Sequence, residues 1–188
     1  MMNENMMLEP AAFLDMWQEK YFLGQEFLTW LWITSEINGN YLVIQPQGSV
    51  EVWFESRLQL ESGEGGDKKS VTCQNPGAEW SEAYTALRRS KKLTRGRLKV
   101  RSEEKEWSLS LAADSLTPQG VKFPKTFTHG EDEEDDSLTG RFMERVALLN
   151  ELNGIIEALF KQFLELRLSA AWSEKILPDL NRWLSTRA

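Results

Sequence analysis

Two neighbouring stretches of the chain alternate polar and apolar residues, and this pattern constrains the fold more than any other feature. Residues 93–101 read LTRGRLKVR, and residues 106–112 read EWSLSLA. Successive side chains of a β-strand point to opposite faces, so each stretch predicts a strand with one face against a core. Only the segment SEEK connects the two, which favours an antiparallel hairpin.

Patterns on either side of this hairpin predict an α+β fold in a single domain of 188 residues. We expect an antiparallel sheet of about five strands, helices on one face and a long C-terminal helix. The expected parts are an N-terminal helical segment at 8–37, a mainly β region with one helix at 41–128, and C-terminal helices at 137–187. Within them we expect helices at 8–19, 26–37, 78–91, 137–169 and 172–184, a turn at 37–40, and further strands at 41–45, 49–61 and 70–74.

Two helices carry the apolar residues expected to form most of the core. Residues 26–37, EFLTWLWITSEI, have almost no polar face, which favours a buried helix over a base-stacking platform. Gly24, just before them, is expected to break or bend the chain. The long helix has apolar residues at helical spacing. Its expected buried stripe is Phe142, Val146, Leu149, Leu152, Ile156, Leu159, Phe160 and Phe163.

The predicted hairpin also contains an unusual concentration of positive charge. The chain carries a net charge of −7, yet residues 88–101 hold eight Lys or Arg and no acid. Alternation places four of these cations on one strand face, while four others cluster at the end of the preceding helix, where positive charge suits the helix dipole. The strand cations are Arg95, Arg97, Lys99 and Arg101, and the helix-end cations are Arg88, Arg89, Lys91 and Lys92.

Two interpretations of this cationic segment stay open. Lys, Arg and neighbouring Ser hydroxyls are the groups that bind nucleic-acid phosphates, and the absence of a recognition motif argues against sequence-specific readout. We therefore expect all eight cations to contact double-stranded DNA non-specifically. Alternatively, the face is a solvated surface balanced by Glu103, Glu104, Glu106 or the acidic run 131–136. A separate functional alternative is a protein-interaction module, in which the basic face binds an acidic partner or the chain's own acidic run.

Signs of catalysis or of a metal site are scarce. His129 is the single histidine and Cys73 the single cysteine, and no nucleophile motif accompanies either. The acidic run GEDEEDD at 130–136 lacks the spacing of a calcium loop and indicates a solvated linker. We therefore expect no enzyme activity, no cofactor and no metal. The start of the chain has no secretory pattern and no segment is apolar enough to span a bilayer, so we expect a cytoplasmic protein.

The order of elements resembles the recombination-associated RdgC family over roughly residues 83–166. The resemblance consists of RRSKK, LTRGRLKV, WSLSLA, SLTPQGVKF, an acidic stretch, and RFMERVALLNELNGIIEAL, together with FLGQEFLTWLW nearer the start. It implies a non-enzymatic, cytoplasmic or nucleoid-associated bacterial protein. Such a protein binds duplex DNA, forms a homodimer and restrains the RecA recombinase. Compared with longer members of that family, we expect the chain to lack much of the N-terminal part that helps them form a ring.

Overall fold

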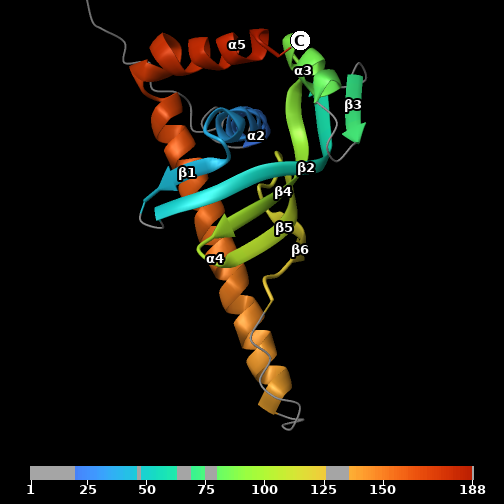
Figure 1. Ribbon diagram of the computed structural model, residues 1–188, viewed down its shortest axis with the longest axis vertical. Coiled ribbons are helices and arrows are strands. Elements are labelled where there is room, and N and C mark those ends of the chain that lie inside the picture. The colour runs from blue at the N-terminus through green and yellow to red at the C-terminus, as the bar shows by residue number, and fades with distance from the viewer. Residues whose placement is uncertain (1–19, 46–47, 63–68, 75–79, 126–135, 188) are drawn as a thin grey trace, which may run out of the picture.

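The computed structural model describes residues 20–45, 48–62, 69–74, 80–125 and 136–187. These residues form one antiparallel sheet of six strands with helices packed against it, which confirms the α+β prediction (Figure 1). The strands are β1 Tyr41–Ile44, β2 Gly48–Ser62, β3 Lys69–Gln74, β4 Lys92–Ser102, β5 Lys105–Ala112 and β6 Pro118–Lys122. The helices are α2 Lys20–Ile37, α3 Ser81–Arg88, α4 Asp136–Arg167, the π-helical turn η2 Trp172–Ile176 and α5 Leu177–Ser185. The expected helix at 8–19 and the acidic run up to residue 135 lie outside the described residues.

The sheet is built around the long strand β2. The strand order is β1-β2-β4-β5-β6. β1 pairs with residues 48–51 of β2, and β3 pairs with residues 57–62 at the other end of the same strand. The predicted hairpin is present as β4 and β5, with Leu98 opposite Leu109 and Arg97 opposite Ser110. The strand β6 was not expected, because its sequence PQGVK contains proline and glycine, two residues that strands generally avoid. In the structure Gly120 has a φ of +58°.

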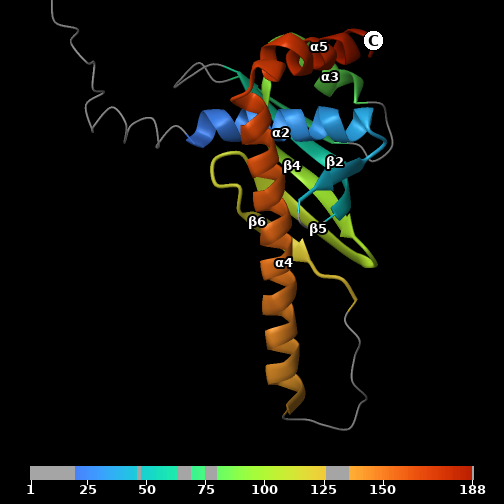
Figure 2. The ribbon, with the colours of Figure 1, turned by 90° about the vertical axis from the view of Figure 1, so that its left-hand side faces the viewer.

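Helices α2 and α4 lie on the same side of the sheet, and α5 crosses above α2 (Figures 1 and 2). Phe27, Trp30 and Trp32 of α2 are buried, so they belong to the core as expected. Phe27 and Trp30 meet the Phe163 ring of α4 at centroid distances of 5.7 and 5.6 Å. Trp32 stacks on Tyr84 of α3 at 5.6 Å, and both side chains donate hydrogen bonds to the Glu36 carboxylate. These contacts fix α2 between the sheet and the other helices.

Gly24 lies inside α2 and does not break it, which corrects the expected interruption. A Cβ atom at this position would stand 1.8 Å from the carbonyl oxygen of Ala113, just beyond β5. The glycine therefore allows the helix backbone to approach the sheet closely. Thr29 adds a polar tie on the same helix, since its Oγ1 accepts a hydrogen bond of 3.1 Å from the Leu93 amide of β4.

The buried stripe of α4 is shorter than its sequence predicts. Leu152, Ile156, Leu159 and Phe163 are buried, and Leu149 and Phe160 are half-buried. Phe142 is 65% exposed and Val146 is 37% exposed, so the expectation that they line the core is wrong. The first turns of α4 extend past the edge of the sheet (Figure 2), and Phe142, Met143 and Val146 are exposed there.

Candidate nucleic-acid interface

The predicted segregation of charge on β4 is present in the structure. Thr94, Gly96, Leu98 and Val100 are buried, whereas the four cations between and after them are half-buried or exposed. On β5, Trp107, Leu109 and Leu111 are buried in the same manner. Because α2 and α4 lie on the apolar side, the cations lie on the opposite face, and no helix of the described residues covers it (Figures 1 and 2). We call this surface the outer face of the sheet.

Arg95 and Arg97 keep their positive charge available on the outer face. The Arg95 guanidinium donates a hydrogen bond of 3.1 Å to the neutral side-chain oxygen of Gln119 on β6. Arg97 stands directly opposite Ser110, and the described residues show no ion pair to it. Both guanidinium groups can therefore meet an external anion without first breaking an internal salt bridge.

The four helix-end cations differ among themselves. Arg88 and Arg89 are exposed at the end of α3, and within the described ranges Arg88 makes a long 3.4 Å contact with the Thr85 hydroxyl and no ion pair. The Lys91 ammonium donates to the Ser62 hydroxyl at 3.3 Å and to the Lys69 carbonyl. Lys92 pairs with Glu26 of α2 at 3.8 Å. Arg88 and Arg89 are thus the accessible members of this group.

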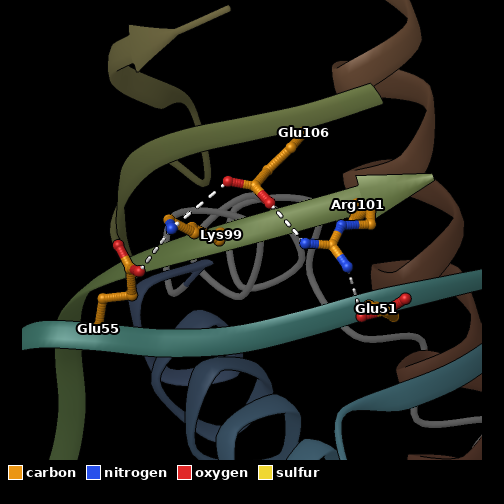
Figure 3. Close-up of polar contacts among 5 residues, drawn as sticks. All are labelled: Glu51, Glu55, Lys99, Arg101 and Glu106. Atoms are coloured by element: carbon orange, nitrogen blue, oxygen red, sulfur yellow. Dashed lines mark hydrogen bonds and ion pairs between the residues drawn. The ribbon is translucent and has the colours of Figure 1, made fainter. Parts of the chain in front are cut away.

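Lys99 and Arg101 are neutralised within the sheet (Figure 3). Lys99 lies 3.0 Å from Glu55 and 3.4 Å from Glu106, and Arg101 lies 2.8 Å from Glu106 and 3.4 Å from Glu51. The five side chains form one chain of ion pairs across β2, β4 and β5, which we call the ion-pair network. Two cations face three carboxylates in it, so its formal charge is −1. Of the acids expected to balance this face, Glu106 does so, whereas Glu103 and Glu104 are exposed in the turn.

The ionisation of the network follows from these contacts. A hydrogen bond from Arg101 is the main cause that lowers the pKa of Glu106, with Lys99 adding to it. A hydrogen bond to Glu55 is the main cause that raises the pKa of Lys99, and the one to Glu106 raises the pKa of Arg101. All three groups therefore stay charged at neutral pH. The Trp53 ring lies under the two cations, at 5.8 Å from Lys99 and 5.2 Å from Arg101.

The outer face includes charged residues that the sequence did not identify. Arg57 on β2 is exposed and Lys122 on β6 lies opposite Ser108, so both extend the cationic area. We call Arg57, Arg95, Arg97 and Lys122 the cationic patch. In the sequence, Glu51 and Glu55 alternate with the apolar residues Val50, Val52 and Phe54. No local sequence pattern, however, predicts that β2 pairs with β4. Their position follows from the register, which sets Glu51 opposite Arg101 and Glu55 opposite Arg97.

Cys73 is the one remaining candidate nucleophile that lies within the described residues. Cys73 is buried on β3, and burial is the main cause that raises the pKa of its thiol, which makes it a poor nucleophile. Within the described ranges no three His, Cys, Asp or Glu side chains are grouped to hold a metal ion. None of the described helices is both long enough and apolar enough to cross a membrane. His129 lies outside the described residues.

Comparison of the chain with protein-family models and with curated proteins produced no match.

Proposed function

We propose that this protein binds DNA without sequence preference, through phosphate contacts with the outer face of the sheet. The observation that carries the proposal is the alternation of β4. It places Arg95 and Arg97 on a face that no described helix covers, and no described acid forms an ion pair with either of them. Ser110 opposite Arg97 adds a hydroxyl of the kind that hydrogen-bonds phosphate. The cationic patch thus supplies four positive charges, and Arg88 and Arg89 extend it at the end of α3.

The eight candidate cations do not contribute equally to this proposal. Lys92, Lys99 and Arg101 each have a carboxylate partner within 4 Å, so a phosphate must compete for them. Arg88, Arg89, Arg95 and Arg97 make no such pair among the described residues, and Lys91 hydrogen-bonds only neutral oxygens. The proposed DNA path therefore runs over the start of β4 rather than along its full length.

The resemblance to the RdgC family extends the proposal to a biological role. We propose a part in recombination or replication repair, with RecA as a protein partner, and a homodimer as the working form. The chemistry that supports this role is non-specific phosphate binding by the outer face. Such binding fits a protein that acts on DNA irrespective of sequence.

An Arg95→Ala/Arg97→Ala variant tests the proposal against a matched control. Lys161→Ala/Lys175→Ala removes the same two charges from exposed positions on α4 and η2. With a labelled random duplex at 50 mM salt, we expect the first variant to bind at least about tenfold more weakly than the parent. The slope of log affinity against log salt should also fall by about 2, since each lost phosphate contact removes about 0.9. Equal affinities for the two variants, or no binding by the parent at micromolar protein, contradict the proposal.

A protein-interaction module is the second candidate, and a specific observation favours it. Tyr41 and Val43 of β1 are 59% and 65% exposed on the same outer face, beside the negatively charged ion-pair network. Aromatic and apolar groups with a mixed polar surround are typical of protein interfaces. Two results together favour this candidate. The parent should leave duplex DNA unshifted at low salt, and the Tyr41→Ser/Val43→Ser variant should lose the self-association that the parent shows in sedimentation.

A further inference from the structure

The outer face contains its own anionic competitor for DNA. We propose that Glu51, Glu55 and Glu106 compete with DNA phosphates for Lys99 and Arg101, and thereby hold the DNA affinity of the face below what its cations alone could support. This inference rests on the proposed function, and it concerns the regulation of the same site.

The geometry of the network shows how the competition arises (Figure 3). Each cation is clamped between two carboxylates, at 3.0 and 3.4 Å for Lys99 and at 2.8 and 3.4 Å for Arg101. A carboxylate and a phosphate offer the same anionic oxygens to an ammonium or guanidinium group. The donors that a phosphate would use are therefore already used by the glutamates.

The network is accessible enough for this competition to occur at its surface. Its five side chains are between 26% and 42% exposed, so none is sealed in the core. Ion pairs at this degree of exposure are weak, and a phosphate can displace a carboxylate from such a pair. The displaced carboxylate stays next to the phosphate and repels it, however, because the network holds one more acid than it holds cations. Binding over Lys99 and Arg101 is consequently disfavoured.

Glu106 occupies the central position in this network. It is the one acid that contacts both cations, because β5 places it opposite Arg101 and beside Lys99. Removing its charge leaves two cations facing two carboxylates and frees one contact on each cation. We infer that Glu106 limits the phosphate path to the end of β4 that carries Arg95 and Arg97.

Neutralising the glutamates one at a time tests the inference. Glu106→Gln keeps the size of the side chain while removing its charge and one of its two acceptor oxygens. Glu104→Gln is the control, since it removes the same charge from an exposed position in the same hairpin that makes no ion pair among the described residues. Duplex DNA binding by fluorescence anisotropy at 50 mM salt should be about three- to tenfold tighter for Glu106→Gln than for Glu104→Gln. Glu55→Gln/Glu106→Gln should bind tighter still, with a salt slope steeper by about 1, because Lys99 is then available to one more phosphate.

A further substitution separates freed cations from a general charge effect. Adding Lys99→Ala to the double variant should cancel the extra salt slope. If the slope stays steep, or if Glu106→Gln binds no tighter than Glu104→Gln, the inference is overturned while the proposed function stands. If neither the parent nor any glutamine variant binds DNA, both are overturned. Thermal unfolding by circular dichroism checks that each variant is folded, and Glu51→Gln provides a second measurement should Glu106→Gln lower the melting temperature markedly.

Discussion

At the scale of single residues, close backbone contacts decide positions that side-chain patterns leave open. A glycine next to an apolar helix usually indicates a break, because glycine is a poor helix former. Gly24 is instead the point where α2 touches the chain just after β5. No local pattern distinguishes these two uses of glycine, because the contact depends on Ala113, which lies far along the chain.

Alanine substitution at two helical glycines should therefore give opposite results. Gly24→Ala forces a methyl group against the Ala113 carbonyl, which is backbone and cannot swing aside. We expect it to lower the free energy of unfolding by about 2 kcal/mol or more, as overpacking of a core does. Gly140→Ala on α4 meets no atom within 4 Å and should raise that free energy by up to about 1 kcal/mol. Urea unfolding of both variants measures the difference, and equal signs would contradict the close contact.

At the scale of elements, the sequence predicts what is local and misses what depends on a distant partner. The β4–β5 hairpin, the turn at 37–40 and the two faces of β4 follow from alternation and short connections, and all are present. The strand β6 carries weak local preferences and is held by its pairing with β5. The cations of the candidate site could be identified, but the pairing of Lys99 and Arg101 with acids of β2 could not, because it depends on strand register.

Helix α4 shows the same limit, since its apolar spacing continues beyond the elements that cover it. Phe163 is completely buried against Phe27 and Trp30, whereas Phe142 is 65% exposed. The same substitution at the two sites should therefore differ strongly in effect. Phe163→Ala should lower the free energy of unfolding by about 3–5 kcal/mol, as deletion of a buried aromatic side chain does. Phe142→Ala should change it by less than about 0.5 kcal/mol, as exposed positions generally do.

Chemical denaturation of the two variants at low protein concentration provides the measurement. A large loss of stability in Phe142→Ala would show that its side chain is covered in solution. That coverage would then have to come from another copy of the chain or from residues outside the described ranges.

At the scale of the whole molecule, charge is separated rather than evenly mixed. The chain has a net charge of −7, yet the outer face combines the cationic patch with a network of charge −1. Overall acidity and a local phosphate-binding area can coexist, because exposed charges are screened beyond roughly 8–10 Å at physiological salt. The same network links β2, β4 and β5, so it connects the charge of the face to the stability of the sheet.

The pH dependence of stability should reveal that link. The pKa of Glu106 in the folded protein lies below its usual value of 4.5, so folding favours the ionised form. The stabilisation is present at neutral pH and is lost as the pH falls through the folded pKa, since the unfolded chain takes up the proton first. The raised pKa of Lys99 sets the upper pH limit of the network's contribution to stability. The stabilisation by the charged Lys99 is lost as the pH rises through its folded pKa, which lies above 10.5. The Glu106→Gln variant should therefore be less stable than the parent across the interval between these limits. The difference should shrink as the pH falls below 4.5 and vanish below the folded pKa of Glu106, where both proteins lack the charge. Urea unfolding at a series of pH values tests this, with Glu104→Gln expected to follow the parent throughout. A deficit that stays constant as the pH falls below 4.5 would mean that Glu106 stabilises the sheet by packing, and the ionic account of the network would then fail.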